Sequence, residues 1–316
     1  GSRRVAQWMW GVQQRSAGSC RASGLARRIG LNRDLLALRS VDRIVAFCRE
    51  REDELDGVNV ITALHRMAKC RGAEERGGAL PRWLEARVSE SMATAKPIGL
   101  ANTAWAVAVL SEPHEPLLQS ISSSALRTMS DFRARDLATL AWSFSTLAVQ
   151  DHPLLHSIAE SSIAKMDLFG PVDLASPAWS CSRLLWPHAP LRNAISAAAI
   201  RSLAQVEWGT QAVSNMAWSV SVLEWRHEPL LQSLASAALP KSGDYGPQDL
   251  VNTVWSFSSR SLSHSPLFDA LASAALPRLA ELTAQGLSNT AWAFATRSYC
   301  NRPLMNAIAS AARNTR

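Results

Sequence analysis

LANTAW, at residues 100–105, is the first of six copies of one short pattern in this chain of 316 residues. The later copies read LATLAW, LASPAW, VSNMAW, LVNTVW and LSNTAW, and they end at Trp142, Trp179, Trp218, Trp255 and Trp292. Successive tryptophans are 37, 37, 39, 37 and 37 residues apart. So regular a step indicates repeated units that each bury an apolar face against their neighbours.

A proline follows every motif tryptophan at an offset of 11 residues. These prolines are Pro116, Pro153, Pro190, Pro229, Pro266 and Pro303. Each opens a stretch rich in Ala, Leu and Ser, such as PLFDALASAAL at residues 266–276. Proline is tolerated in the first turn of a helix because its missing N–H would have no partner there. The pattern therefore predicts one helix after each proline and a second helix around each tryptophan.

The repeat weakens toward the N-terminus, where TALHRMAK at residues 62–69 places His65 at a tryptophan position. We expect an all-α fold, a right-handed α-solenoid of about seven two-helix repeats of 37 to 39 residues plus a terminal helix. The expected organisation is a basic arm or transit-like segment at 1–33, degenerate repeats at 34–95 and a regular array at 96–316. Small residues flank the tryptophans, so we expect the indoles to stack between repeats as a structural core.

Composition narrows the class of protein. Apolar residues make up 47% of the chain, but no uncharged apolar run approaches the roughly 18 to 20 residues that cross a bilayer, so we expect no membrane span. The sequence shows no nucleophile elbow, glycine-rich phosphate loop, paired carboxylates or zinc-knuckle spacing. We therefore expect no enzyme activity, cofactor, metal site or small-molecule substrate.

We also expect the cysteines and histidines to have structural roles rather than catalytic or metal-binding ones. The cysteines are odd in number and lack a C-x-x-C pair, which indicates free packing thiols in a reducing compartment. They are Cys20, Cys48, Cys70, Cys181 and Cys300. Histidines recur just before the prolines, at His114, His152, His188, His227 and His264. One histidine per repeat cannot converge on one metal ion, so we expect helix capping or loop contacts.

The formal excess charge of +7 is concentrated at the N-terminus. Residues 1–33 contain no Asp or Glu and seven arginines: Arg3, Arg4, Arg15, Arg21, Arg27, Arg28 and Arg33. From Asp34 onward, 26 basic and 26 acidic residues cancel. The segment resembles an organelle transit peptide, but it is equally consistent with a basic arm that binds an anionic partner. Its first two residues, Gly-Ser, are consistent with a cloning remnant.

Three series of residues recur at fixed places in the repeat. The first lies three residues after each proline and is always polar: Gln119, His156, Asn193, Gln232, Asp269 and Asn306. Variation at a fixed polar position is how one-base-per-repeat proteins select RNA sequence, so these are candidate base contacts. A solvated position in a first helical turn is the alternative.

The second series lies 11 or 12 residues after each proline: Arg127, Lys165, Arg201, Lys241 and Arg278. One cation per repeat is consistent with contacts to a phosphate backbone. The alternative is that these cations complement the dipole at a helix C-terminus.

The third series lies three residues before each tryptophan: Asn102, Thr139, Ser176, Asn215, Asn252 and Asn289. A buried polar side chain that recurs in a stack must find a partner. We expect these residues to form a hydrogen-bond ladder between repeats, with base contact as the less favoured interpretation.

The motif copies, together with TALHRMAK, resemble the octotricopeptide and heptatricopeptide repeats, which are relatives of the repeats in FAST-kinase-like proteins. The resemblance covers roughly residues 55–316. It implies an RNA-binding protein of a mitochondrion or plastid, and many members of the family carry a C-terminal RAP domain, which we do not expect in this chain.

We therefore expect a non-catalytic RNA-binding protein, located in the mitochondrion or alternatively in the plastid. Its expected role is that of a structural subunit of an organellar ribonucleoprotein, such as a mitochondrial ribosome, or an RNA maturation factor. Its partners would be organellar rRNA or mRNA and the protein subunits of a larger assembly. The near-neutral charge of residues 34–316 favours the alternative, a protein scaffold within an organellar complex.

Overall fold

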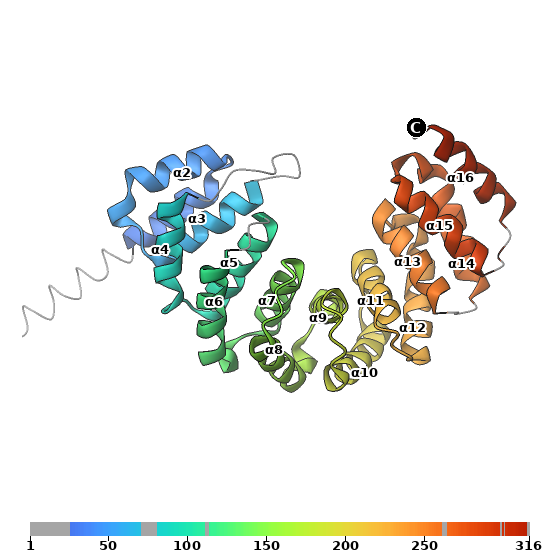
Figure 1. Ribbon diagram of the computed structural model, residues 1–316, viewed down its shortest axis with the longest axis horizontal. Helices are drawn as coiled ribbons and strands as arrows, with labels where there is room; N and C mark the ends of the chain where they lie inside the picture. Colours follow the sequence, from blue (N-terminus) through green and yellow to red (C-terminus); the bar gives the residue numbers. More distant parts are fainter. Residues whose placement is uncertain are drawn as a thin grey trace, which may run out of the picture. The chain divides into compact units, whose positions relative to one another are not determined.

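The computed structural model describes residues 26–70, 81–110, 114–260, 264–297, 299 and 301–314. Every regular element in these segments is a helix, and none of them contains a strand (Figure 1). The expected all-α class is confirmed. None of the helices in the described part of the chain is both long and apolar enough to span a membrane.

The chain divides into two compact units, Gly1–Thr128 and Met129–Arg316. In the first unit, a helix over residues 26–37 is followed by α2 (Val41–Glu50), α3 (Gly57–Cys70), α4 (Arg82–Met92), α5 (Pro97–Leu110) and α6 (Glu115–Arg127). The second unit contains α7 (Ala134–Thr146), α8 (His152–Ala164), α9 (Pro171–Arg183), α10 (Ala189–Gln205), α11 (Thr210–Val222), α12 (Glu228–Ala238), α13 (Pro247–Ser259), α14 (Ser265–Ala275), α15 (Ala284–Thr296) and α16 (Arg302–Asn314). Short 3-10 turns are η1 (Glu52–Glu54), η2 (Met129–Asp131), η3 (Met166–Leu168), η4 (Leu239–Asp244) and η5 (Leu276–Glu281).

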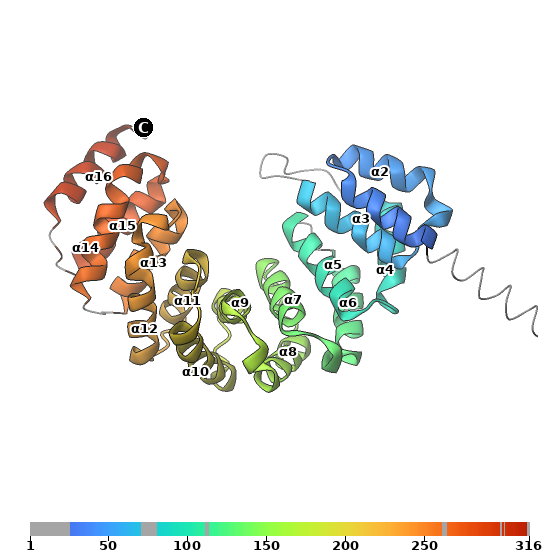
Figure 2. The same cartoon turned by 180° about the vertical axis from the view of Figure 1, so that it is seen from behind.

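Within the second unit the helices form two layers (Figures 1 and 2). The odd-numbered helices from α7 to α15 carry the motif tryptophans, and each packs against the next odd-numbered helix. The even-numbered helices from α8 to α16 lie behind them and contact one another less extensively. The exposed side of the odd-numbered layer is therefore a continuous surface formed by successive repeats.

The predicted proline signal is confirmed, because proline occupies the first turn of α6, α8, α10, α12 and α14. The residue before these helices is often a histidine that caps the helix. Nδ1 of His188, His227 and His264 accepts a hydrogen bond of 3.2 Å from the backbone N–H three residues later. Asp151 and Asn301 cap α8 and α16 in the same way. The predicted capping role of the histidines is thus confirmed at three repeats.

Three of the odd-numbered helices, α7, α9 and α11, are followed by a left-handed residue that is not glycine. Ala148, Leu185 and Glu224 have φ angles of 56°, 50° and 48°, and each lies six residues after its motif tryptophan. The next residue donates its N–H back into the helix, as Trp186 does to the Cys181 carbonyl at 2.8 Å. This hydrogen bond satisfies a carbonyl that the helix end would otherwise leave unpaired.

The buried aromatic core is not made of the motif tryptophans, and the prediction that they form it was wrong. In the second unit, the residue ten positions before each motif tryptophan is large and buried instead: Phe132, Phe169, Trp208, Tyr245 and Leu282. A second buried series lies two positions after the tryptophan and includes Phe144, Phe257 and Phe294. Trp208 is only 2% exposed, whereas Trp292 is 48% exposed. The other motif tryptophans are half-buried at the surface.

The ladder between repeats is built by serines, and the predicted asparagine ladder was wrong. The hydroxyls of Ser182, Ser221 and Ser258, each three residues after a motif tryptophan, are buried. They donate hydrogen bonds to the carbonyls of Ser219, Ser256 and Ala293 in the next odd-numbered helix, at 3.2, 2.8 and 2.9 Å. A small side chain lets the two helices approach closely enough for a hydroxyl to reach the neighbouring backbone.

Candidate nucleic-acid interface

Four positions on each odd-numbered helix of the second unit remain at least partly exposed, and on α7, α9, α11 and α13 most of the other positions are buried. They lie 7 and 3 residues before the motif tryptophan, at the tryptophan itself, and 4 residues after it, which places them on one side of a helix. We call this surface of the second unit the tryptophan face. It consists of Arg135, Thr139, Trp142 and Thr146 on α7; Val172, Ser176, Trp179 and Arg183 on α9; Gln211, Asn215, Trp218 and Val222 on α11; Gln248, Asn252, Trp255 and Ser259 on α13; and Gln285, Asn289, Trp292 and Thr296 on α15.

The indoles form a row across this face. The ring centroids of Trp142 and Trp179 are 6.2 Å apart, with an interplanar angle of 26°. Those of Trp179 and Trp218 are 6.4 Å apart at 34°. The tryptophans follow one another from repeat to repeat, as predicted, but they do not lie in the core. The structure places them at a surface where a ligand can reach them.

The polar residue three positions before each tryptophan shares this surface. Asn215, Asn252 and Asn289 are half-buried. Nε2 of Gln248 donates a hydrogen bond of 2.9 Å to Oδ1 of Asn252 on the same helix. Within the described part of the chain, the amide groups of Asn215 and Asn289 make no hydrogen bond. Their donors and acceptors are therefore available to a ligand.

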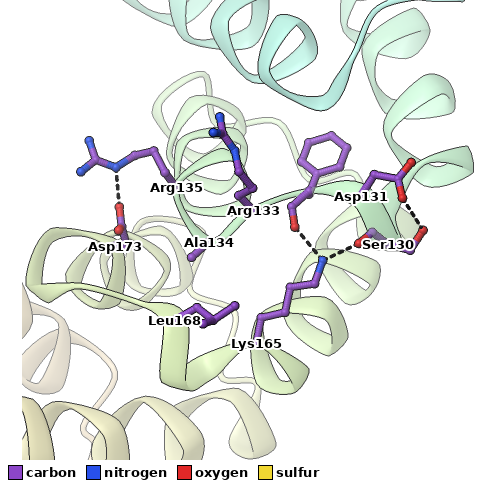
Figure 3. Close-up of a pocket in the computed structure, with 9 residues that line it drawn as sticks. Ser130, Asp131, Arg133, Ala134, Arg135, Lys165, Leu168 and Asp173 are labelled. Atoms are coloured by element: carbon purple, nitrogen blue, oxygen red, sulfur yellow. Dashed lines mark hydrogen bonds and ion pairs between the residues drawn. The ribbon is translucent and has the colours of Figure 1, made fainter.

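No residue of the tryptophan face is acidic, and two are arginines. The guanidinium carbon of Arg183 lies 5.8 Å from the ring centroid of Trp179. Nε of Arg135 lies 2.6 Å from Oδ1 of Asp173 in the next repeat (Figure 3). Asp173 thus neutralises Arg135, whereas Arg183 makes no ion pair among the described residues and is electrostatically compatible with an anionic ligand.

The first unit repeats the same arrangement on α3 and α5. His65 occupies the tryptophan position, as predicted, and its ring centroid lies 4.9 Å from that of Trp105. Burial, together with Lys69 and Arg66, lowers the pKa of His65, so the neutral ring is favoured. A pocket of about 580 Å³ opens between these helices and is lined by Val58, Thr62, Ile98 and Asn102, among others.

The six candidate base-contact residues lie on a different surface. Gln119, His156, Asn193, Gln232, Asp269 and Asn306 are all exposed, and all belong to even-numbered helices. On α8 the buried residues are Leu154, Leu155 and Ile158, so His156 points away from the odd-numbered layer. In the second unit these side chains therefore lie on the side opposite the tryptophan face.

Several of these polar groups already have partners within the fold. Nε2 of Gln119 donates to Oε1 of Glu115 at 3.3 Å, and Gln232 makes the corresponding bond to Glu228 at 3.1 Å. The hydroxyl of Tyr299 donates to Oδ1 of Asp269. The His156 ring packs edge-on against Trp186, with centroids 5.1 Å apart. These contacts account for polar residues at the position without any RNA.

The candidate phosphate contacts mostly bind the preceding repeat. Nζ of Lys165 donates to the carbonyls of Ser130 and Phe132 at 2.6 Å each, within a surface pocket at the start of α7 (Figure 3). Lys241 donates to the carbonyl of Trp208 at 2.6 Å and lies 2.5 Å from Glu207.

The remaining cations of this series vary. Arg278 donates to the carbonyl of Tyr245. Arg201 pairs with Asp167 at 2.9 Å, and exposed Arg127 donates to Ser124 of its own helix at 2.9 Å. In three repeats the cation thus binds the loop that carries a buried aromatic residue, and phosphate would have to compete with those carbonyls.

The arginine-rich N-terminus is described only in part. Arg3, Arg4, Arg15 and Arg21 lie outside the described residues, as does Cys20. Arg27 pairs with Glu54 at 2.8 Å and Arg28 with Asp56 at 3.5 Å, so both bind the segment before α3. Arg33 lies 3.8 Å from Asp34 and its side chain is 84% exposed.

The remaining titratable groups have structural surroundings. Across the described segments, no three His, Cys, Asp or Glu side chains are grouped so that they could hold a metal ion. Cys48, Cys70 and Cys181 are free thiols. Burial raises the pKa of Cys48 to about 11 and that of Cys181 to about 12, so both are protonated near neutral pH. Cys300 lies outside the described residues.

No protein-family model matches the chain, and no curated protein sequence matches it significantly.

Proposed function

We propose that this chain is a non-catalytic RNA-binding protein, built as a right-handed α-solenoid of octotricopeptide or heptatricopeptide type. It acts as a structural subunit or RNA maturation factor in an organellar ribonucleoprotein, with the mitochondrion as the first location to test and the plastid as the second. The RNA lies along the tryptophan face of Met129–Arg316.

The row of half-exposed indoles is the observation that carries this proposal. Large aromatic side chains are normally buried when they serve only packing, and this chain has a separate buried aromatic series for that purpose. Proteins that bind single-stranded nucleic acid present aromatic rings on which successive bases stack. Each such contact contributes about 1–3 kcal/mol, so a few rings give substantial affinity without a strongly basic surface.

Charge on this face supports RNA over a basic peptide. Arg183 offers a cation beside Trp179, and none of the residues of the face is acidic, although Arg135 is paired with Asp173 of the next repeat. Two phosphate contacts on single-stranded RNA correspond to a slope of about 1.4 in the logarithm of affinity against the logarithm of salt concentration. Binding dominated by stacking should therefore depend only weakly on salt.

The second candidate function is a protein scaffold in the same kind of organellar complex. It is favoured by exposed apolar side chains outside the indole row, including Leu168 at 73% and Leu185 at 71%. Such residues are common at protein interfaces, although scattered single ones are normal on any surface. Stable co-purification with defined proteins after nuclease treatment would favour the scaffold.

The test is the equilibrium affinity of the full chain for a fluorescently labelled, unstructured 12-nucleotide RNA of mixed sequence. We expect measurable binding with a salt slope near 1.4, and an affinity about 30-fold weaker or more when Trp179 and Trp218 are both changed to Ala. The matched control changes Asn193 and Gln232, on even-numbered helices, to Ala and should leave the affinity unchanged. No binding at low salt, or loss of binding only in the control variant, would contradict the proposal.

A further inference from the structure

Three consecutive repeats carry the same set of side chains on the tryptophan face. The sets are Gln211, Asn215 and Trp218 on α11; Gln248, Asn252 and Trp255 on α13; and Gln285, Asn289 and Trp292 on α15. The corresponding residues of α7 are Arg135, Thr139 and Trp142, and those of α9 are Val172, Ser176 and Trp179. The sets with Gln and Asn therefore occupy α11, α13 and α15, whereas α7 and α9 have no Gln or Asn at these positions.

The spacing of the indoles is close to that needed for an inserted base. A ring held between two others requires about 7 Å between the outer rings, twice the carbon–carbon contact distance of about 3.5 Å. The measured separations are 6.2 Å for Trp142–Trp179 and 6.4 Å for Trp179–Trp218. A shift of these half-exposed rings by less than about 1 Å would admit one base between the members of each of these two pairs.

Asparagine lies one helical turn before Trp218, Trp255 and Trp292, where it can reach the edge of a base stacked on the indole. Its amide offers a donor and an acceptor in one plane, the arrangement with which Asn reads a base edge. Nε2 of Gln248 donates to Oδ1 of Asn252, which fixes the orientation of that amide and leaves its Nδ2 group without a partner among the described residues. The amides of Asn215 and Asn289 have no partner among the described residues.

We infer that Asn215, Asn252 and Asn289 read the base edges of three successive nucleotides of single-stranded RNA, each base being stacked on the neighbouring motif tryptophan. This inference rests on the proposed RNA-binding function of the tryptophan face. Because the three sets are identical, they select the same base three times, and the preferred RNA contains a run of one base. Thr139 and Ser176 on α7 and α9 discriminate less.

The alternative occupant of such a face is an extended peptide, whose backbone amides can also pair with asparagine. None of the residues of the face is acidic, which disfavours a basic peptide, and Arg183 beside Trp179 suits a phosphate backbone. The observations therefore favour RNA, and peptide binding is an outcome that the experiment detects.

The experiment measures the affinities of the full chain for fluorescently labelled 12-nucleotide oligo(A), oligo(C) and oligo(U). We expect one of these RNAs to bind about tenfold more tightly than the weakest, or better. Changing Asn215 and Asn252 to Ser, the residue at position 176, should reduce that ratio toward one while the weakest affinity stays the same. Circular dichroism and urea unfolding verify that the variant keeps its fold.

The matched control makes the same change on the opposite surface. Asn193→Ser with Asn306→Ser should leave the ratio of affinities unchanged. Equal weakening of all three RNAs in the Asn215 and Asn252 variant, or a changed ratio in the control, would overturn the inference. Binding that needs Trp179 and Trp218 but shows no base preference would overturn this inference alone, whereas the absence of RNA binding would overturn the proposed function as well.

The peptide arm uses reduced, carboxymethylated α-lactalbumin as an unfolded polypeptide. We expect it not to displace the RNA. Displacement that is lost when Asn215 and Asn252 are changed to Ser would show that these amides bind a peptide backbone, and the inference would then be wrong.

Discussion

The hydroxyl of Ser221 donates a hydrogen bond of 2.8 Å to the backbone carbonyl of Ser256, which lies 35 residues later in the next repeat. Ser182 and Ser258 make the same contact with their own neighbours. Each of these serines comes three residues after a half-exposed tryptophan. The side chain that joins adjacent helices thus lies one helical turn from the side chain offered to a ligand, and the serine is buried whereas the tryptophan is half-exposed.

Changing Ser221 to Ala should lower the free energy of unfolding by about 1 kcal/mol, the usual contribution of one hydrogen bond. Ser145→Ala is the matched control, because Ser145 is equally buried but donates to Trp142 of its own helix at 2.9 Å. Urea unfolding followed by circular dichroism measures both. Equal stability of the two variants would show that the bond between repeats contributes nothing specific.

Replacement by Ala should destabilise the protein much more at Trp208 than at Trp218. Trp208 is 2% exposed and donates to Ser202 at 3.1 Å, so its loss should cost about 3–5 kcal/mol of unfolding free energy. Trp218 is half-buried and packs on Trp179, so its loss should cost about 1 kcal/mol. Denaturant midpoints give the comparison, and a Trp218 variant as unstable as the Trp208 variant would place that indole in the core.

Leu185→Gly should stabilise the protein. Leu185 has a φ of 50° and its side chain is 71% exposed, so it has the backbone strain of the left-handed region without much packing to offset it. Removing that strain is worth about 1–2 kcal/mol, less about 0.5–1 kcal/mol for the greater freedom of glycine in the unfolded chain. Thermal unfolding should show a higher midpoint for Leu185→Gly than for Leu185→Ala, and equal midpoints would argue against strain at this site.

Acid should weaken the cap of α10. Burial, and next the nearby His156, lower the pKa of His188 in the fold, although Glu160 opposes them. The neutral His188 ring therefore stabilises the fold at pH values above the unfolded pKa of about 6.5. This stabilisation is lost as the pH falls through the lower folded pKa. Protonation also removes the Nδ1 acceptor for Leu191 N–H, a cap worth about 1 kcal/mol.

His188→Asn tests that pH dependence, because Asn301 already caps α16 at the equivalent position. The variant should match the original protein at pH 7.5 and lose less stability between pH 7 and pH 5. Urea unfolding across this range is the measurement. Parallel losses in the two proteins would assign the acid sensitivity to other groups.

Helices were predictable because proline and the repeat interval mark their positions directly. His65 was also placed correctly, since its register follows from TALHRMAK alone. The buried and exposed sides of the tryptophan helices could not be predicted, because apolar and small residues occupy nearly all sides of these helices and leave no clear polar stripe. The one available signal was the polar residue three positions before each tryptophan, which shares its helical side and lies at the surface.

The hydrogen-bond partners of the lysines and arginines in the second series could not be predicted, because they are mostly backbone carbonyls of another repeat. Lys165 and Lys241 bind carbonyls of the preceding repeat, and the accessibility of a backbone carbonyl is set by the folded loop. Both carbonyls belong to buried aromatic residues, Phe132 and Trp208, 33 residues earlier. The sequence shows this constant separation of 33 residues, but only the folded structure shows that it corresponds to a hydrogen bond between adjacent repeats.

The central claim is that RNA lies on the tryptophan face, and photocrosslinking tests it most directly. The full chain would be irradiated with 4-thiouridine-containing single-stranded RNA, and the crosslinked peptides identified by mass spectrometry. The account predicts crosslinks within α9, α11 and α13, at or beside Trp179, Trp218 and Trp255. Crosslinks confined to the even-numbered helices, around His156, Asn193 and Gln232, would contradict it.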